Sequence, residues 1–326
     1  LLSYLEAILR VYNQLGRRDN IYKARIKILV EQVGVEAFAE MVEAEWRNIR
    51  HGELHLPAEE LARIAAYFAP PAYEKLPDHC LALEAARAAD PGFASWLDSN
   101  VEAHKQPGYA VVTISLKPHG GIPGDATAEQ MEAVADLAAH YSFGEIRVTY
   151  KQNLVLADVR KADLHELWLG LRLDDLATAN AGLVSDIIAC PGLDYCNLAN
   201  ARSIPIAQEI GRRFRDIERE HGIGPVTVNV SGCINACAHH HMANIGILGV
   251  DKKGSEAYQI TLGGRATEDA AIGAIIGPAV AGDQVADAVE TIVDVYLAGR
   301  RSGEAFIDTY RRTGPEPFKE KLYATA

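Results

Sequence analysis

The sequence has no apolar run of the roughly 18 residues that a membrane-spanning helix needs, and its N-terminus lacks the layout of a signal peptide. Positive charge is also in deficit, since 32 Lys and Arg stand against 44 Asp and Glu and the net charge is -12. That balance argues against a nucleic-acid-binding surface and gives no attraction to anionic membranes. We therefore expect a protein of the reducing cytoplasm that has no membrane span and binds no nucleic acid.

Cysteine is scarce as well, with five residues in 326, a small and odd number that argues against the disulfide framework of a secreted protein. The hydrophobic share of 48% is that of an ordinary globular chain, and the length allows one large core or two smaller ones. Cys80 stands alone in the sequence and is expected to pack as a small hydrophobic residue. The other four cysteines are paired and carry the strongest chemical signal in the chain.

These four cysteines form two short motifs, Cys190 with Cys196 and Cys233 with Cys237. Five residues lie within the first pair and three within the second. Four thiolates from two short loops can hold an iron–sulfur cluster, because each iron takes one soft sulfur ligand. Zinc ligands usually have about two to four residues between them, so zinc fits the second gap but not the first. A zinc-stapled structural module is the alternative that this reasoning leaves open.

Segments around the cysteines resemble the cluster-binding signature of the sirohaem-dependent nitrite and sulfite reductases. The resemblance continues in an R-x-T-x-x-Q-N pattern and in Leu262-Gly263-Gly264, and together these stretches span roughly residues 108 to 265 in the family's order. The matching segments around the cysteines are Cys190-x5-Cys196, Val230-Ser231-Gly232-Cys233-Ile234-Asn235-Ala236-Cys237 and Asn244-Ile245-Gly246-Ile247-Leu248-Gly249. The R-x-T-x-x-Q-N pattern lies within Arg147-Val148-Thr149-Tyr150-Lys151-Gln152-Asn153-Leu154.

The resemblance implies a 4Fe-4S cluster held by Cys190, Cys196, Cys233 and Cys237, with the sulfur of Cys237 also bridging to the iron of a sirohaem. The implied reaction is the six-electron reduction of sulfite to sulfide, with the reduction of nitrite to ammonia as the alternative. Electrons would come from a donor such as ferredoxin or a flavoprotein. A monooxygenase of corrinoid biosynthesis, which shares the cysteines within this family, is a further alternative.

The resemblance also implies cofactor-binding roles for Arg147, Gln152 and Asn153, which lie on or beside a predicted strand end. A forked guanidinium and amide donors suit the carboxylates on the rim of a sirohaem. The triplet His239-His240-His241 receives no role, because three adjacent histidines cannot all face one metal ion on regular backbone.

From residue 108 the sequence pattern predicts the order strand, helix, strand, strand, helix, which is the split βαβ arrangement of a ferredoxin-like layer. Thr127 and Gln130 form a capping box at the start of the first helix. With the resemblance, the fold class is α+β: this layer plus an α/β domain that binds the cluster and sirohaem, as in the sulfite reductase haemoprotein. The predicted elements are strand 110–116, a helix to about 141, strands 146–150 and 154–159, and helix 162–169.

We expect three regions: a helical linker region over residues 1–107, a ferredoxin-like half-domain over 108–180, and a 4Fe-4S and sirohaem-binding domain over 181–326. The chain begins Leu1-Leu2-Ser3, without Met and within a predicted helix, which suggests a fragment. The resemblance implies a preceding N-terminal half that contributes most of the catalytic, anion-binding residues. The fragment alone is then expected to bind its cofactors poorly and to be inactive.

Further expectations concern the second half of the chain. A single helix over residues 197–220 would begin just after Cys196 and point its free N–H groups at the cluster. Gly263 and Gly264 would let the backbone approach a flat macrocycle, and residues 304–313 would form a terminal helix followed by a strap. Four arginines on the predicted long helix form either a solvated face or a docking patch for an acidic electron donor: Arg212, Arg213, Arg215 and Arg219.

Overall fold

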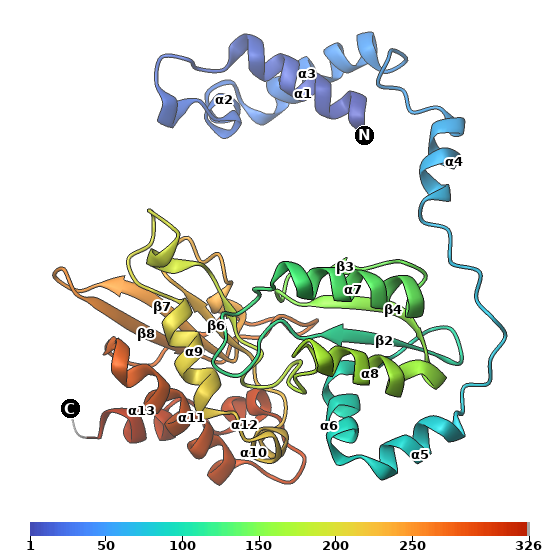
Figure 1. The fold of residues 1–326 in the computed structure, drawn as a ribbon. Helices are drawn as coiled ribbons and strands as arrows, with labels where there is room; N and C mark the ends of the chain where they lie inside the picture. Colours follow the sequence, from blue (N-terminus) through green and yellow to red (C-terminus); the bar gives the residue numbers. More distant parts are fainter. Residues whose placement is uncertain (325–326) are drawn as a thin grey trace. The chain divides into compact units, whose positions relative to one another are not determined.

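The computed structural model describes residues 1–324, and the chain divides into two compact units at Tyr73 and Glu74. The first unit is helical and is drawn in blue in Figure 1. Its first and third helices pack together through the buried side chains of Ala7, Val11 and Val42. Its helices are α1 (Leu2–Leu15), α2 (Ile26–Val33), α3 (Val35–Ile49) and α4 (Ala58–Ala66).

The second unit begins with an antiparallel sheet of four strands in the order β1-β2-β4-β3. Two helices pack against this sheet and enclose a core that includes Val112, Ile114, Leu156 and Trp168. The predicted ferredoxin-like order of strand, helix, strand, strand, helix is confirmed. The elements are β1 (Val101–Ala103), β2 (Tyr109–Ile114), α7 (Ala128–Tyr141), β3 (Arg147–Val148), β4 (Leu154–Arg160) and α8 (Leu164–Leu173), preceded by α5 (Leu81–Ala89) and α6 (Pro91–Asn100).

The start of α7 shows why sequence reasoning located this helix well. The backbone N–H of Gln130 donates to Thr127 Oγ1 at 3.2 Å, and the N–H of Thr127 donates to Gln130 Oε1 at 3.0 Å. This reciprocal capping box satisfies two N–H groups that the helix itself leaves without partners, and such caps typically contribute about 1 kcal/mol. The predicted capping box is confirmed.

A second sheet of six strands follows, with the order β10-β8-β7-β6-β5 and with β9 paired to β8. Valine and isoleucine alternate on its inner face and pack against α9 and α11, which lie over the same side of the sheet in Figure 1. Burying each such side chain contributes about 1.5–3 kcal/mol. The elements are β5 (Ile188–Ala189), α9 (Ile204–Arg213), α10 (Ile217–Ile223), β6 (Val228–Ser231), β7 (Ile245–Asp251), β8 (Glu256–Leu262), β9 (Ala274–Ile275), β10 (Val280–Ala281), α11 (Val285–Gly299), α12 (Phe306–Thr313) and α13 (Glu316–Tyr323).

The pairing of β5 with β6 determines where the cysteines go. The two strands are parallel neighbours, with Ala189 opposite Val230. Each strand ends just before a cysteine motif, since Cys190 follows β5 and Gly232 with Cys233 follows β6. Because the carboxyl ends of parallel strands meet at the same edge of a sheet, both cysteine motifs leave the sheet together.

The predicted helix over residues 197–220 is wrong. The chain after Cys196 stays irregular until α9 begins at Ile204, and a second helix, α10, begins after Asp216. Pro205 occupies the first turn of α9, where proline is tolerated because its missing N–H would have had no helical partner. The carboxylate of Asp216 accepts from the N–H of Arg219 at 3.1 Å and so caps a new helix.

One smaller difference concerns the end of the chain. The predicted strap after residue 313 is the short helix α13, whose Phe318 is buried against the main core. Within residues 1–324, no helix combines the length and the apolar character needed to cross a bilayer.

Candidate functional site

The two cysteine motifs form loops that touch each other. We call residues 190–196 the first cysteine loop and residues 232–239 the second cysteine loop. The N–H of Cys190 donates to Val230 O at 3.1 Å, which continues the parallel pairing of β5 and β6 into the loops. On the other side, the N–H groups of Asn200 and Ala201 donate to Gly232 O at 2.8 and 3.1 Å. The loops are therefore held by backbone bonds at both flanks.

Two glycines allow this close approach. Gly192 has a φ of +59°, in the left-handed region that favours glycine. A Cβ atom on Gly232 would lie 2.6 Å from Ala201 O and 3.0 Å from the Cα atom of Gly192, so a larger residue would push the loops apart. The N–H groups of residues 200 and 201, which the predicted long helix would have pointed at the cluster, are used instead to bind the second cysteine loop.

All five cysteines are free thiols in the structure. Cys190 and Cys196 are half-buried, Cys233 is buried and Cys237 is exposed. Cys80, half-buried, lies apart from these loops in sequence, immediately before α5. The structure thus brings the two loops of the paired cysteines together. It does not close their sulfurs into one ligand set, because no three His, Cys, Asp or Glu side chains in the described chain converge on a single metal position.

The residues present fit an iron–sulfur cluster in two respects. The donor set is four reduced thiols on two touching loops, which is the ligand type and number that a 4Fe-4S cluster takes. Beside Cys233, the fully buried hydroxyl of Ser231 has no hydrogen-bond partner among the described residues. A buried polar atom without a partner is unusual and indicates a missing group next to it.

The sulfur of Cys190 already has two polar neighbours. The N–H of Gly232 donates to it at 3.1 Å, and the hydroxyl of Ser203 lies 3.3 Å from it. Ser203 precedes α9 at the N-cap position, where a serine hydroxyl normally caps the helix, yet its side chain makes no capping bond. The buried Ser203 hydroxyl is directed to the cysteine instead.

The second cysteine loop carries an unusual backbone. Ala236 and His239, on either side of Cys237, have φ values of +54° and +53°, which non-glycine residues rarely adopt. The side chain of Asn229, on β6, donates to Ala238 O at 2.7 Å and helps to hold this conformation. Strained backbone of this kind concentrates at functional sites, where the surrounding structure over-determines it.

The three histidines differ in burial, since His239 and His241 are exposed and His240 is not. His240 is buried, and its ring lies against that of His241 with 3.9 Å between centroids and the ring planes tilted by 30°. Burial and the neighbouring His241 lower the pKa of His240 to about 4. His240 is therefore a neutral packing residue at physiological pH. The close approach that Gly264 permits is to the carbonyls of His241 and Ala243, because a Cβ atom there would lie 2.6 and 2.4 Å from them.

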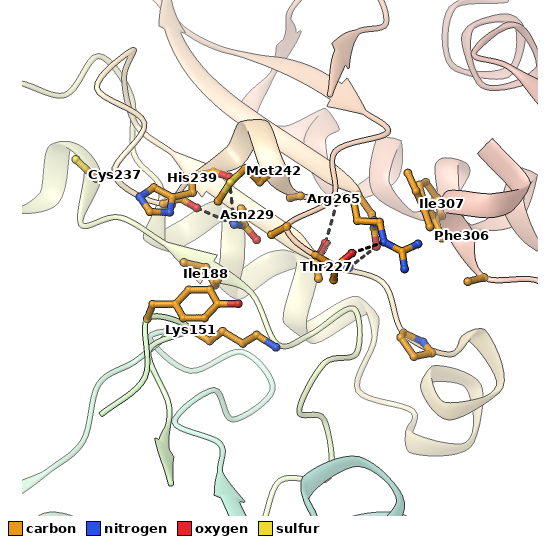
Figure 2. Close-up of a pocket in the computed structure, with 18 residues that line it drawn as sticks. Lys151, Ile188, Thr227, Asn229, Cys237, His239, Met242, Arg265, Phe306 and Ile307 are labelled. Carbon is orange, nitrogen blue, oxygen red and sulfur yellow. Dashed lines mark hydrogen bonds between the residues drawn. The ribbon is translucent and has the colours of Figure 1, made fainter. Parts of the chain in front are cut away.

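A cavity of about 300 Å³ opens beside the second cysteine loop, with Cys237 on its rim. Figure 2 shows Lys151 and Arg265 among its lining residues, and Asn229 next to the loop, where it donates to Ala238 O. Arg265 is paired with Asp269 at 2.8 Å. The cavity thus combines an apolar wall, which includes Phe306, with cationic groups that suit an anionic ligand.

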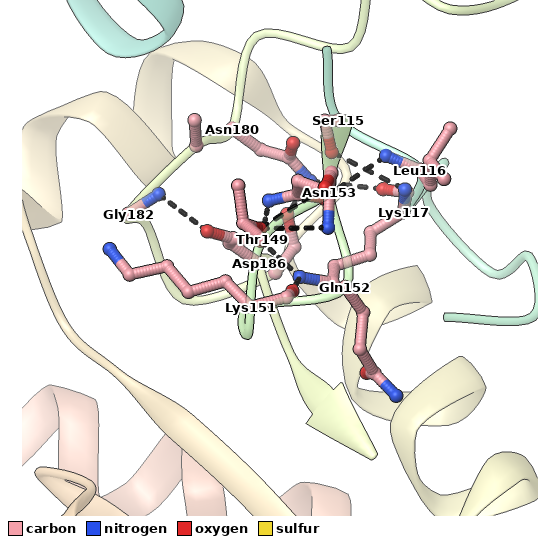
Figure 3. A network of polar contacts seen from close by, with 12 residues as sticks. Ser115, Leu116, Lys117, Thr149, Lys151, Gln152, Asn153, Asn180, Gly182 and Asp186 are labelled. Carbon is pink, nitrogen blue, oxygen red and sulfur yellow. Dashed lines mark hydrogen bonds and ion pairs between the residues drawn. The ribbon is translucent and has the colours of Figure 1, made fainter. Parts of the chain in front are cut away.

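The three residues predicted to bind cofactor have different positions. Arg147 lies on β3, exposed and paired with Glu145. The amides of Gln152 and Asn153 are engaged with the protein itself: Gln152 binds the backbone of Ala189, and Asn153 is buried in the polar network that Figure 3 shows. These contacts link the ferredoxin-like layer to the segment that leads into Cys190.

Sequence reasoning missed two members of this network, Lys117 and Asp186. Lys117 is 2% exposed, and its Nζ donates to Asp186 Oδ1 at 2.6 Å and to the carbonyl of Lys151. Burial lowers the pKa of Lys117, while the Asp186 carboxylate opposes that shift. The sequence did contain one signal that could have identified Lys117. Ser115 and Lys117 alternate with apolar residues directly after a buried strand.

Two family models match this chain. The model described as the nitrite and sulphite reductase 4Fe-4S domain matches residues 1–49 and 181–325. The model of the nitrite/sulfite reductase ferredoxin-like half domain matches residues 103–173. The first description confirms the predicted 4Fe-4S cofactor, and the second confirms the ferredoxin-like layer.

Curated relatives include both kinds of reductase. A protein named sulfite reductase [ferredoxin] 2 from Mycolicibacterium paratuberculosis is 28% identical over 310 residues, which cover 92% of this chain and 49% of that protein. A ferredoxin–nitrite reductase from Synechococcus elongatus is 29% identical over 308 residues, covering 91% and 51%. The chain therefore spans about half the length of the curated relatives it matches.

Solved structures agree on the fold. The NirA protein of Mycobacterium tuberculosis is 26% identical, with a TM-score of 0.62 over 97% of this chain and 53% of its own. A dissimilatory sulfite reductase I, at 14% identity and a TM-score of 0.57, shares the fold over 67% of this chain. The predicted α+β fold class is confirmed. With a 4Fe-4S domain model matched over more than half of its length, the chain belongs to the nitrite and sulphite reductase family.

Proposed function

We propose that this chain supplies the cluster-bearing half of an enzyme that reduces sulfite to sulfide at a coupled sirohaem and 4Fe-4S centre. Nitrite reduction to ammonia by the same centre is the second candidate, because relatives of similar identity are named for each substrate. The observation that supports the proposal most directly is the contact between the two cysteine loops at Gly192 and Gly232.

In this proposal Cys190, Cys196, Cys233 and Cys237 would be the cluster ligands, and Cys237, which is exposed, would be the ligand shared with the sirohaem. The bound cofactors would supply the path for electrons and the metal at which the anion is reduced. The protein's part is to hold the thiols. Asn229 fixes the backbone of the second cysteine loop by its bond to Ala238 O.

The cavity beside Cys237 would receive part of the macrocycle. Lys151 and Arg265 would pair with its carboxylates, since cationic side chains in a partly enclosed cavity bind carboxylates more strongly than in open water. Arg147, exposed on β3, is a further candidate for such a contact. The residues that bind sulfite or nitrite and donate protons to it would come mainly from the part of the enzyme outside this chain.

The electron donor is proposed to be a ferredoxin or a flavoprotein. The arginines on α9 and α10 offer such a donor little unpaired positive charge. Arg213 and Arg219 both pair with Glu290, and Arg212 pairs with Glu209. Exposed charges that are already paired add little to long-range attraction. The solvated face predicted as one alternative for these residues is therefore preferred over a docking patch.

The test is chemical analysis of protein purified without oxygen. We expect iron and acid-labile sulfide in a ratio that fits one 4Fe-4S cluster per chain, with sirohaem absorption in the full-length enzyme and sulfite turnover with reduced viologen. Changing any one paired cysteine to Ser should remove the cluster, whereas the matched change Cys80→Ser should keep it. One zinc per chain without colour would support the structural-module alternative, and oxygen-dependent turnover of a precorrin would support the monooxygenase.

This chain alone is proposed to be inactive, since its relatives are about twice as long. Assaying the 326-residue chain beside the full-length enzyme tests this directly. Equal turnover by the two would contradict it.

A further inference from the structure

The side chain of Gln152 is bonded at two points to the residue that precedes Cys190. Its Nε2 donates to Ala189 O at 2.8 Å, and the N–H of Ala189 donates to its Oε1 at 3.0 Å. Ala189 ends β5, which lies at the edge of its sheet and, among the described strands, pairs with β6 alone. The amide of Gln152 therefore acts as a short extra strand on the open edge of β5.

Successive residues of this segment form hydrogen bonds to Gln152 and then to β6. Ala189 turns both of its polar groups toward Gln152, and the next residue, Cys190, turns its N–H toward Val230 O at 3.1 Å. The first cluster ligand is thus fixed from two sides. One side is β6 within the same sheet, and the other is the ferredoxin-like layer.

Gln152 itself occupies a costly conformation. Its φ is +60°, at the tip of the turn between β3 and β4, where Thr149 N–H donates to Asn153 O at 3.0 Å. Gly124 packs against it so closely that a Cβ atom there would lie 2.8 Å from the Cβ atom of Gln152. A strained backbone that is held by close packing is typical of residues with a functional role.

The turn is anchored by the next residue. Asn153 is 1% exposed, accepts from the N–H of Leu116 at 3.1 Å and donates to Asp186 Oδ1 at 2.9 Å. Asp186 also accepts from Lys117 Nζ at 2.6 Å and from the N–H of Gly182 at 2.8 Å. In Figure 3 the side chain of Gln152 extends away from this network, which leaves its amide to serve Ala189.

We propose that Gln152 is a positioning residue for Cys190, which it fixes through the backbone of Ala189, and that Asn153 anchors the turn that aims it. The inference rests on the proposed cluster for the role of Cys190, but the positioning itself is a property of the protein. This positioning role differs from the direct contact with sirohaem that the sequence pattern predicted. In each of the two amides, both the oxygen and the nitrogen are already hydrogen-bonded within the protein.

The chain offers a matched control for this idea. Gln130 makes the same pair of bonds with the same lengths elsewhere in the ferredoxin-like layer: its Nε2 donates to Asp174 O at 2.8 Å, and its Oε1 accepts from Thr127 N–H at 3.0 Å. Gln130→Ala therefore removes equivalent bonds without touching the cysteine loops. Gln152→Glu is a second variant that keeps the size and the acceptor but loses the donor to Ala189 O.

Two measurements test the proposal, the first on the 326-residue chain and the second on the full-length enzyme. In cluster-free protein, the rate of alkylation of Cys190 relative to Cys233 is measured by peptide mass spectrometry. In cluster-containing protein, the rate of iron loss to a chelator is followed. We expect Gln152→Ala to raise both rates roughly five-fold and Gln152→Glu to raise them in the same direction, because one or two hydrogen bonds are lost. Gln130→Ala should leave both near wild type.

Each outcome is decisive. Equal rates in Gln152→Ala and Gln130→Ala would overturn the positioning role. If Gln152→Ala fails to fold by circular dichroism, Gln152→Glu is used for the same comparison. If the wild-type full-length enzyme binds no cluster, the proposed function fails, and the alkylation of Cys190 alone then decides whether Gln152 positions it.

Discussion

The hydroxyl of Ser203 lies 3.3 Å from the sulfur of Cys190. Ser203 is fully buried, and Cβ atoms placed on Gly192 and Gly232 would lie 3.0 and 3.1 Å from its Oγ atom. The hydroxyl therefore occupies the junction of the two cysteine loops. When Cys190 is a thiolate, only the hydroxyl can donate in this contact, so the bond would stabilise negative charge on the sulfur.

We predict that Ser203→Ala lowers the reduction potential of the cluster, because a lost hydrogen bond to a ligand sulfur destabilises the more negative, reduced state. We also expect iron loss to a chelator to accelerate by about ten-fold, the lower end of the range for residues that orient metal ligands. The potential is measured by redox titration followed by electron paramagnetic resonance.

Ser142→Ala is the control for this change. Ser142 is also fully buried, and its hydroxyl accepts from the N–H of Asp158 at 3.3 Å, within the ferredoxin-like layer. Both variants lose a single long hydrogen bond, so their unfolding free energies should fall by similar amounts, about 1 kcal/mol. An identical potential in Ser203→Ala and Ser142→Ala would mean that the hydroxyl does not act on the cluster.

The contact between the loops predicts a strong effect at Gly232. Gly232→Ala should lower the free energy of unfolding by about 1–3 kcal/mol, because its Cβ atom would lie 2.6 Å from Ala201 O in a packed region. Gly222→Ala is the matched control, since no atom lies within 4 Å of that Cβ position in α10 and the change should be neutral or stabilising. Chemical denaturation of both variants measures the difference, and equal stability would contradict the tight contact.

Local signals in the sequence predicted much of the fold. The capping box at Thr127 and the alternation of apolar residues identified α7 and β4, because both depend on neighbours within a few positions. The cysteine spacing identified the two loops for the same reason. The helix expected over residues 197–220 is interrupted because Pro205 cannot occupy a helix interior and lies instead in the first turn of α9, a local signal that the expectation overlooked.

The roles of Gln152 and Asn153 could not be predicted from the sequence. The R-x-T-x-x-Q-N pattern singled out the right residues, yet the partner of Gln152 lies 37 positions away, and that of Lys117 lies 69 positions away. Only the packing of the two sheets brings these groups together. A short polar motif therefore identifies residues under constraint without revealing what they bind.

The buried pair of Lys117 and Asp186 should contribute to stability mainly by avoiding an unpaired charge. Lys117→Met is expected to lower the free energy of unfolding by about 3–5 kcal/mol, because it leaves the Asp186 carboxylate buried without its cation. Adding Asp186→Asn should restore part of that loss, since Asn is neutral and its oxygen still accepts from Asn153. The double-mutant cycle is measured by denaturant unfolding.

The exposed pair of Arg87 and Asp98 provides the comparison for the buried one. The two side chains are 53% and 51% exposed, and Arg87→Met should lower the free energy of unfolding by less than about 1 kcal/mol. If Arg87→Met and Lys117→Met lower the free energy of unfolding by similar amounts, burial of the Lys117 charge does not increase the effect of losing the pair.

The last prediction concerns pH and His240, whose pKa falls from its ordinary value of 6.5 to about 4. Between these values the unfolded chain binds a proton that the folded chain excludes, so stability falls as pH drops through this window and changes no further below it. Above this window, the lowered pKa of His240 contributes roughly 3 kcal/mol to the free energy of unfolding. His240→Gln removes it, so the stability gap between wild type and variant, measured by urea unfolding, should shrink from pH 7 to pH 4. Parallel curves over that range would mean that His240 titrates alike in both states.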